Sequence, residues 1–332
     1  MDVLVTGARG FVGMNIARYL ATNGATVWAA DRSPVDGWIE RFLASCSARI
    51  HHITADLSTE GELLRTLDPT AELTAVVHAA VVTATTTEVE KRDARGIVDS
   101  NVGGTIEALN AAVELGASRF IYVSSPSAIG RVSSADPVDE AVTPRPDSLY
   151  GITKLASEQI VDRWTDLFDL EAASVRIAQP YGPGERATSA RIRTSPIWEW
   201  LRDAEPGAVL PTGPLERARD WTYVEDTAEG IGRLVTADRL STNLYHLGTG
   251  KQARVADVFD ALNARIGGLE YDEDPAPDAL NPNIAGPGRP PLDVRRFESE
   301  FSWKPATSIQ DGMSRYLDWW AGFQDESGSP GD

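Results

Sequence analysis

Three glycines at three-residue spacing lie near the start of the chain, between two short apolar runs. The first run, Val3–Val5, is typical of a strand that is buried on both faces. The turn that follows it contains Gly7, Gly10 and Gly13. Apolar residues then recur at helical spacing, and the second run, residues 25–30, ends at Asp31. This order of strand, glycine turn, helix, strand and acid predicts a β–α–β unit.

A unit of this kind is typical of a site for a dinucleotide. Because the turn has no bulky side chains, backbone amides can approach a pyrophosphate at the positive end of the helix. An acid at the end of the second strand can accept both hydroxyls of an adenosine ribose. Glycine at such a turn can also mark only a tight corner, but the complete order of elements favours the nucleotide site. The predicted cofactor-binding residues in this unit are Gly7, Arg9, Gly10, Phe11, Val12, Gly13, Asp31 and Arg32.

Two later strand ends complete the predicted cofactor site. The run Ile50–Thr54 predicts a strand, and the acid that follows it, Asp56, lies where an adenine edge can be recognised. Asp56 has an alternative role as the N-cap of a helix predicted over Glu60–Leu67. The next predicted strand, Leu73–Ala80, ends in small residues across which a cofactor can lie. The predicted contacts at these two ends are Asp56, Leu57, Ala79 and Ala80.

The acid at the end of the second strand also indicates which dinucleotide is bound. The Asp31 carboxylate would repel a 2′-phosphate and accept the ribose hydroxyls, which favours NAD over NADP. Arg9 and Arg32 keep NADP open as an alternative, because guanidinium groups that swing over the site would hold the additional phosphate.

Predicted strands and helices alternate up to residue 178, which indicates an α/β fold with a doubly wound parallel sheet, the Rossmann arrangement. Prolines and glycines become dense after Gln179, which predicts a smaller C-terminal α/β substrate domain. Residues 81–93 have little periodicity and predict an active-site loop, while residues 270–291 predict a proline-rich loop before a final helix over Ile309–Phe323. The predicted division gives 1–178 to the dinucleotide-binding domain with a return around 225–252, 179–224 and 253–324 to the substrate domain, and 325–332 to a flexible tail.

Charge and cysteine content exclude several classes of function. The chain has 49 acidic and 31 basic residues and a net charge of −18, so nucleic acid and anionic membranes are poor partners. The single cysteine, Cys46, excludes a disulfide framework, and the four histidines lack metal-ligand spacing. No apolar run approaches the ~18 residues of a membrane-spanning helix, and the first strand leaves no room for a signal peptide. We therefore expect a cytoplasmic protein without a metal.

Residues that can transfer a proton lie later in the chain. Tyr150 and Lys154 are four residues apart in a predicted helix (Leu149–Phe168), and therefore lie on the same face. A nearby cation stabilises a phenolate, which suits a tyrosine that exchanges a proton with an alcohol. Ser125 lies just past the end of a predicted strand, where its hydroxyl can bind the same reacting oxygen. A tyrosine–lysine pair alone is common on helix surfaces, but together with the dinucleotide site these residues predict hydride transfer.

At this point the sequence resembles a known family. The glycine turn, Asn101, Ser125 and the Tyr150/Lys154 pair match the pattern of the short-chain dehydrogenases/reductases. Its extended branch, the NAD-dependent epimerases/dehydratases, is similar in chain length and in three further segments: residues 101–105, 180–184 and 219–226.

This resemblance implies roles for individual residues. Tyr150 would be the acid/base, Lys154 would hold the nicotinamide ribose and tune Tyr150, and Ser125 would orient the reacting hydroxyl. Asn101, Tyr150 and Lys154 are thereby added to the predicted cofactor contacts. The predicted substrate contacts are Val82, Ser125, Ser127, Gln179, Arg219 and Arg289, the two arginines as ligands of a diphosphate. Family members pair the helices that correspond to residues 101–115 and 149–168, so we also expect a homodimer.

Departures from the family pattern narrow the activity. Dehydratases carry an Asp–Glu pair directly after the hydroxyl residue, whereas Pro126 and Ser127 occupy those positions here, which argues against dehydration. Ile129 and Gln179 replace a tyrosine and an asparagine that are usual in nucleotide-sugar enzymes, and they leave the substrate class open. The leading prediction is an NAD-dependent nucleotide-sugar 4-epimerase. The alternatives are an NAD(P)-dependent dehydrogenase of a free sugar, sugar acid or other secondary alcohol, and a non-catalytic NAD-binding protein.

Overall fold

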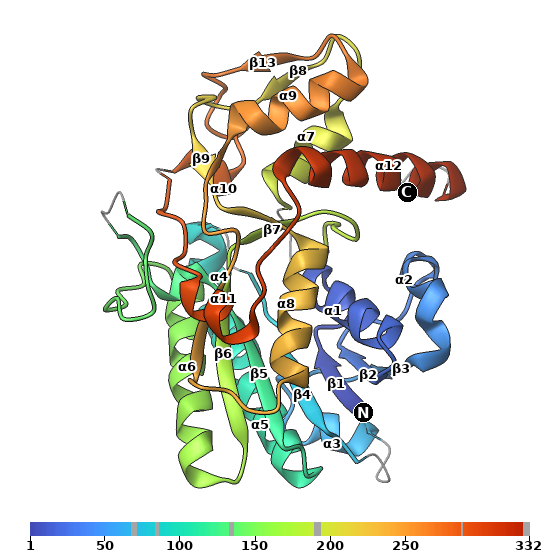
Figure 1. The fold of residues 1–332 in the computed structure, drawn as a ribbon, viewed down its shortest axis with the longest axis vertical. Coiled ribbons are helices and arrows are strands. Elements are labelled where there is room, and N and C mark those ends of the chain that lie inside the picture. The colour runs from blue at the N-terminus through green and yellow to red at the C-terminus, as the bar shows by residue number, and fades with distance from the viewer. Residues whose placement is uncertain (68–71, 84–85, 133–135, 189–193, 287, 328–332) are drawn as a thin grey trace.

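The centre of the fold is a parallel sheet of seven strands, in the order β11–β6–β5–β4–β1–β2–β3 (Figure 1). The computed structural model describes residues 1–67, 72–83, 86–132, 136–188, 194–286 and 288–327. Register is set at the middle of the sheet, where Val5 lies opposite Ala29 on one side and Val77 on the other. The strands are β1 (Asp2–Thr6), β2 (Thr26–Asp31), β3 (Ile50–Thr54), β4 (Ala75–His78), β5 (Arg119–Ser124), β6 (Glu171–Ile177) and β11 (Leu244–Leu247).

Helices cover both faces of this sheet, as the alternating sequence predicted. On one face α1 (Phe11–Thr22), α2 (Gly37–Leu43) and α8 (Val224–Thr236) share an apolar core with the strands, and α11 (Arg295–Phe301) adds Phe297. The other face is covered by α3 (Glu62–Thr66), α5 (Gly104–Glu114) and α6 (Leu149–Leu167). Because both faces are covered, the central strands are apolar throughout rather than alternating, which confirms the doubly wound arrangement.

The C-terminal half lies above the carboxyl ends of the sheet strands (Figure 1). Its own core joins four helices to short strand pairs. Aromatic contacts of its last helix with α2 attach it to the cofactor half: Trp319 to Phe42 and Phe323 to Trp38. The helices are α7 (Pro196–Asp203), α9 (Val255–Ile266), α10 (Pro282–Ala285) and α12 (Ile309–Ser327). The strands are β7 (Gln179–Tyr181), β8 (Val209–Pro211), β9 (Ala218–Arg219), β10 (Trp221–Tyr223), β12 (Ala253–Arg254) and β13 (Glu270–Asp272).

The structure corrects several local predictions. The predicted loop 81–93 is wrong from residue 87 onward, where α4 (Thr87–Val98) begins because the Thr86 side chain accepts a hydrogen bond from the Val89 amide. Asp56 is not the cap of α3, whose N-cap is Gly61; its carboxylate instead binds Ser58.

Near the C-terminus two segments contain more regular structure than predicted. The segment predicted as a proline-rich loop contains β13 and α10, and the last helix continues beyond Phe323 to Ser327. The remainder of the predicted tail, residues 328–332, lies outside the described residues. No helix in the described part of the chain is long and apolar enough to cross a membrane.

Two histidines are buried among polar groups in the cofactor half. Nδ1 of His78 lies 2.7 Å from Thr6 Oγ1, and His246 Nδ1 lies 3.1 Å from the Val138 carbonyl oxygen. Burial lowers the pKa of each imidazole to about 3, so both are neutral in the folded chain at neutral pH.

These histidines should make stability depend on pH. Since the unfolded chain protonates histidine near pH 6.5, it binds more protons than the folded chain between about pH 3 and 6.5. The free energy of unfolding should therefore fall as the pH is lowered through this window, by up to about 1.4 kcal/mol per pH unit for each histidine. Urea unfolding at several pH values should give a shallower slope for His246→Asn, while the exposed His51, changed to Asn, should leave the slope unaltered.

Candidate active site

The glycine turn between β1 and α1 is packed directly against the end of β4. Gly7 has a φ of +67°, and a Cβ on it would lie 2.6 Å from the backbone of Ala80. A Cβ on Gly13 would lie 2.2 Å from the Gly7 carbonyl oxygen. No side chain caps the first turn of α1, so the positive end of this helix is left to an anionic ligand.

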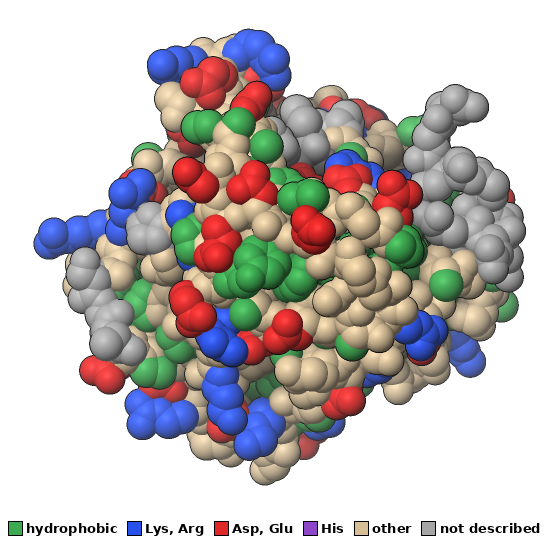
Figure 2. All heavy atoms as spheres, turned by 90° about the horizontal axis from the view of Figure 1, so that it is seen from above, with side chains coloured by type: hydrophobic (Ala, Val, Ile, Leu, Met, Phe, Trp, Pro, Cys, Tyr) green, Lys and Arg blue, Asp and Glu red, His purple; other side chains and the backbone are tan. Residues whose placement is uncertain are grey.

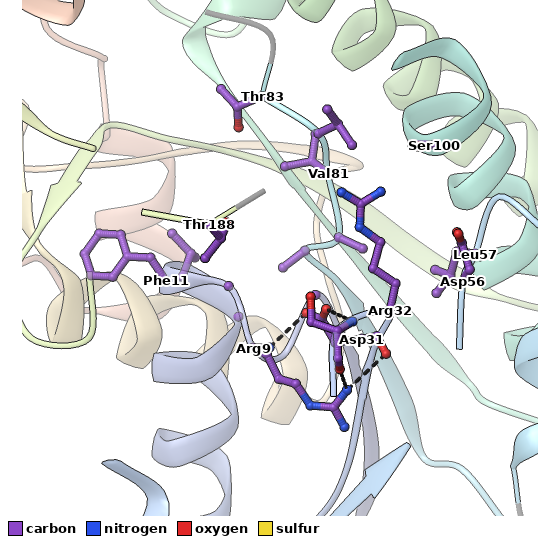
Figure 3. Close-up of a pocket in the computed structure, with 18 of the residues that line it drawn as sticks. Arg9, Phe11, Asp31, Arg32, Asp56, Leu57, Val81, Thr83, Ser100 and Thr188 are labelled. Carbon is purple, nitrogen blue, oxygen red and sulfur yellow. Dashed lines mark hydrogen bonds between the residues drawn. The ribbon is translucent and has the colours of Figure 1, made fainter. Parts of the chain in front are cut away.

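A cavity of about 170 Å³ opens at this turn (Figure 3). It is lined by the predicted residues Gly7, Arg9, Gly10, Phe11, Val12, Gly13, Asp31, Arg32, Asp56, Leu57, Ala79, Ala80 and Val82. Thr83, from the predicted active-site loop, also lines it, as do residues that the sequence did not indicate, among them Ser33, Ser100, Arg186 and Thr188. The last two come from the segment after β7, for which no local motif indicated a place beside the glycine turn.

Asp31 is fixed at the edge of the cavity by two backbone amides. Its Oδ2 accepts a hydrogen bond of 3.0 Å from Arg9 N, and its Oδ1 accepts one of 3.0 Å from Ser33 N. A carboxylate held in this way suits the two hydroxyls of an adenosine ribose and repels a phosphate at the same place. The cavity, the uncapped helix and this acid together fit NAD.

The two arginines beside Asp31 point in opposite directions (Figure 3). The Arg9 side chain is 3% exposed, and its guanidinium donates to the carbonyl oxygens of Asp31 and Ile53, each at 3.1 Å. It supports the ends of β2 and β3, so the idea that it swings over a 2′-phosphate is wrong. Arg32 extends the other way, toward Val81.

Asn101 connects the cavity wall to the helix that carries the predicted catalytic residues. It lies in a π-helical turn (Asp99–Gly103) and is buried. Its Oδ1 accepts from Val82 N at 2.8 Å, and its Nδ2 donates to the Val82 carbonyl oxygen at 3.1 Å and to Thr153 Oγ1 at 3.0 Å. The side-chain amide of Asn101 therefore holds Val82 against α6. Its contact on α6 is Thr153, which lies between Tyr150 and Lys154 in the sequence.

Lys154 is buried between α6 and β5. Its Nζ donates to the Val123 carbonyl oxygen at 2.7 Å and lies 4.7 Å from the centre of the Tyr122 ring and 5.9 Å from that of Tyr150. Burial lowers the pKa of Lys154 to about 7, while the negative charge of Glu158 acts in the opposite direction. The structure therefore places the ammonium group next to the Tyr150 ring, as the helical spacing predicted.

Ser125 caps a 3₁₀ turn (Pro126–Ala128) that packs on α6. Its Oγ accepts from Ser127 N at 3.2 Å, and Ser127 Oγ in turn accepts from Arg289 Nη1 at 3.3 Å. A Cβ on Gly151, the residue after Tyr150, would lie 2.4 Å from the Ser127 carbonyl oxygen, so only glycine permits this approach. Burial lowers the pKa of Arg289, and its bond to Ser127 places this arginine beside the same turn.

Arg219 and Gln179 each make hydrogen bonds to backbone carbonyl groups. The Arg219 guanidinium donates to the carbonyl oxygens of Asn283 at 3.2 Å and Gly286 at 2.9 Å, and burial lowers its pKa to about 10. These bonds fasten β9 to the α10 segment. Gln179 begins β7, and its amide donates to the Asp220 carbonyl oxygen at 3.0 Å.

Comparison with known proteins agrees with this geometry. Residues 3–248 match the model of the NAD dependent epimerase/dehydratase family. The chain belongs to this family. It is therefore an enzyme of the extended short-chain dehydrogenase/reductase type, and its cofactor is NAD.

Individual members are similar over almost the whole chain. A UDP-glucuronate 4-epimerase of Thermodesulfobacterium geofontis is 25% identical over 95% of this chain and 95% of its own. A dTDP-glucose 4,6-dehydratase of Xanthomonas campestris pv. campestris is also 25% identical, over 96% of this chain and 92% of its own. The solved structure of a UDP-glucose-4-epimerase from Stenotrophomonas maltophila, with bound NAD and formylated UDP-arabinopyranose, is 22% identical and shares the fold. It superposes with a TM-score of 0.82 over 98% of this chain and 100% of that chain.

Proposed function

We propose that this enzyme is an NAD-dependent epimerase of a nucleotide sugar, acting at C4. The observation that carries the proposal is the placement of Ser125, Tyr150 and Lys154 around one end of β5, with no acidic pair after Ser125. The similarity to a UDP-glucuronate 4-epimerase supports the substrate class.

Each residue of the site has its own role in the proposed reaction. Bound NAD would supply the hydride acceptor for C4, and the epimer would form when the keto sugar turns in the pocket before the hydride is returned. The cavity residues from the glycine turn to Asp31, together with Arg32, would hold this cofactor. Tyr150 takes the proton of the C4 hydroxyl and later returns it, Lys154 stabilises the phenolate, and Ser125 holds the reacting oxygen.

Dehydration is the less suitable activity for this site. Expelling water requires an acid for the leaving hydroxyl and a base for the adjacent carbon. The residues at the corresponding positions, Pro126 and Ser127, form the 3₁₀ turn, and Ser127 binds Arg289 instead of presenting a carboxyl group.

The test is epimerisation without added cofactor. Incubation of the purified enzyme with UDP-, GDP- and dTDP-sugars should yield a C4 epimer in at least one case, with no net formation of NADH. The absence of product with every nucleotide sugar would overturn the proposal.

A dehydrogenase of a free sugar or sugar acid is the second candidate. It is favoured by Ile129, which is 4% exposed in an apolar cluster with Val138 and Leu292, so this position offers the substrate no hydroxyl group. Steady release of NADH during turnover, together with loss of cofactor on dialysis, would select this function over epimerisation.

We expect Arg289 to contribute more to substrate binding than Arg131, another positively charged side chain near it. If Arg289 binds a diphosphate, Arg289→Ala should raise KM about 10–100-fold with a smaller change in kcat, since one charge-assisted hydrogen bond contributes about 1.5–3 kcal/mol. The control is Arg131→Ala, which removes a nearby charge whose side chain is 81% exposed and bound to Asp147. An unchanged KM for Arg289→Ala would favour a substrate without a diphosphate.

A homodimer through the α5 and α6 faces is part of the proposal. Three large apolar side chains at α6 support it, because Ile152, Leu167 and Phe168 are 50%, 51% and 40% exposed. Light scattering that gives the mass of one chain at micromolar concentration would contradict it.

A further inference from the structure

A buried acid lies one helical turn beyond Lys154. Glu158 on α6 is 8% exposed, and both of its oxygens are used. Oε1 accepts from Ser124 Oγ at 2.5 Å and from Arg176 Nε at 2.9 Å, and Oε2 accepts from Arg176 Nη2 at 2.7 Å. A buried carboxyl group requires such partners, and the two bonds from Arg176 on β6 supply them inside the fold.

This acid and Lys154 hold two consecutive residues of β5. Lys154 binds the carbonyl oxygen of Val123, and Glu158 binds the side chain of Ser124. The residue that follows is Ser125, whose hydroxyl is proposed to orient the substrate. Two hydrogen bonds from side chains of α6 therefore fix the distance between Ser125 and the face of α6 that carries Tyr150.

Glu158 also lies four residues from Lys154 on α6, and its negative charge raises the pKa of that lysine. The other titratable groups around Lys154 are Tyr150 on α6, Tyr122 on β5 and His78 on β4. Burial raises the pKa of Tyr122 far above neutrality and lowers that of His78, so both are neutral near pH 7. Of these neighbours, Glu158 supplies the negative charge that favours a protonated Lys154.

We propose that Glu158 is a positioning residue of the reaction, which fixes the end of β5 that carries Ser125 and supplies a negative charge one helical turn from Lys154. This inference rests on the roles proposed above for Ser125, Tyr150 and Lys154. Glu158 does not touch the substrate; it acts through Ser124 and Lys154.

The test measures the ionisation of Tyr150 in the NAD-bound enzyme, without substrate. Subtracting the phenolate absorbance titration of Tyr150→Phe from that of the parent enzyme isolates this one tyrosine. Glu158→Gln keeps the size of the side chain and an oxygen for Ser124, but removes the charge. Its Tyr150 titration should move upward by at least about one pH unit, because an uncharged Lys154 no longer stabilises the phenolate. At neutral pH kcat should fall about tenfold or more, with little change in KM.

Three further variants distinguish the loss of the bond to β5, the loss of the charge and a failure to fold. Ser124→Ala removes the bond to β5 and keeps the charge, so it should lower kcat while the Tyr150 titration stays in place. Glu158→Asp restores the charge and should return the titration toward that of the parent enzyme. If Glu158→Gln does not fold because Arg176 is left unpaired, the double variant Glu158→Gln/Arg176→Gln gives the same measurement without a buried unpaired charge.

The fold offers a matched control at the opposite ends of the same two strands. Arg119 on β5 and Glu171 on β6 form an ion pair in which the arginine side chain is 9% exposed. Glu171→Gln should lower the thermal midpoint but leave the Tyr150 titration and kcat unaltered.

The outcomes distinguish this inference from the proposed function. A folded Glu158→Gln or double variant whose Tyr150 titration matches the parent enzyme would overturn the role of Glu158, whatever the substrate. A parent enzyme that epimerises no nucleotide sugar would overturn the proposed function, whereas the titration would still decide the role of Glu158.

Discussion

Replacing Tyr150 with phenylalanine is expected to lower kcat about 10²–10⁴-fold, which is the usual contribution of a positioned acid/base. The ring centre of Tyr150 lies 5.9 Å from the buried Lys154 Nζ, and the next residue, Gly151, packs against the Ser127 carbonyl group. Phenylalanine fills the same volume, so α6 and the NAD cavity should be unchanged. The loss should therefore appear in turnover and not in cofactor content.

Turnover of a nucleotide sugar and the absorbance of bound NAD should be measured on the same preparation. Tyr271→Phe is a suitable control, because this tyrosine lies on β13 and is 48% exposed. Turnover of Tyr150→Phe close to that of the parent enzyme would remove Tyr150 from the mechanism. A parallel loss of NAD would show that the substitution had disturbed the cofactor site instead.

In the cofactor half, the methyl group that Gly13→Ala adds is expected to destabilise the fold more than any other single added methyl group. Its Cβ would lie 2.2 Å from the Gly7 carbonyl oxygen, which is a backbone atom held by the close approach of Gly7 to Ala80. Neither side can yield without moving β1 or α1, so overpacking of about 1–3 kcal/mol or more is expected, together with loss of bound NAD.

The measurements are the thermal midpoint and the NAD content after gel filtration. Gly103→Ala provides a matched control, because this glycine has a helical φ of −58° and no atom within 4 Å of an added Cβ. The control should be neutral or slightly stabilising, since alanine restricts the unfolded chain more than glycine does. Normal NAD content in Gly13→Ala would show that the turn adjusts, contrary to the packing described here.

Local signals in the sequence predicted much of the cofactor side of the molecule. The glycine turn and Asp31 belong to one continuous unit whose elements are neighbours in the chain, so spacing alone indicated their arrangement. The helical spacing of Tyr150 and Lys154 likewise predicted that they share a face.

What the sequence did not predict depends on contacts between distant segments. The direction of Arg9 is set by carbonyl groups of β2 and β3, up to 44 residues away. Arg219 is held by carbonyl groups more than 60 residues later. The role inferred for Glu158 likewise requires the register of α6 against β6, which brings Arg176 to it. Spacing within one element carries no information about such partners.

Acidic side chains are spread across the face shown in Figure 2 rather than gathered in one patch. The net charge of −18 is therefore distributed over this surface and is not concentrated at one site.

The position of β11 and α8 has a consequence for how the chain folds as it is synthesised. β11 pairs with β6 at one edge of the sheet, and α8 packs beside α1 in the core of one sheet face. Both come from residues 224–247, after the first segment of the C-terminal half has been made. Until they emerge, the nascent cofactor half has an open strand edge and an uncovered apolar face. A fragment ending at residue 178 should therefore aggregate, whereas one that also carries residues 224–248 through a short linker has the pieces needed to close the sheet.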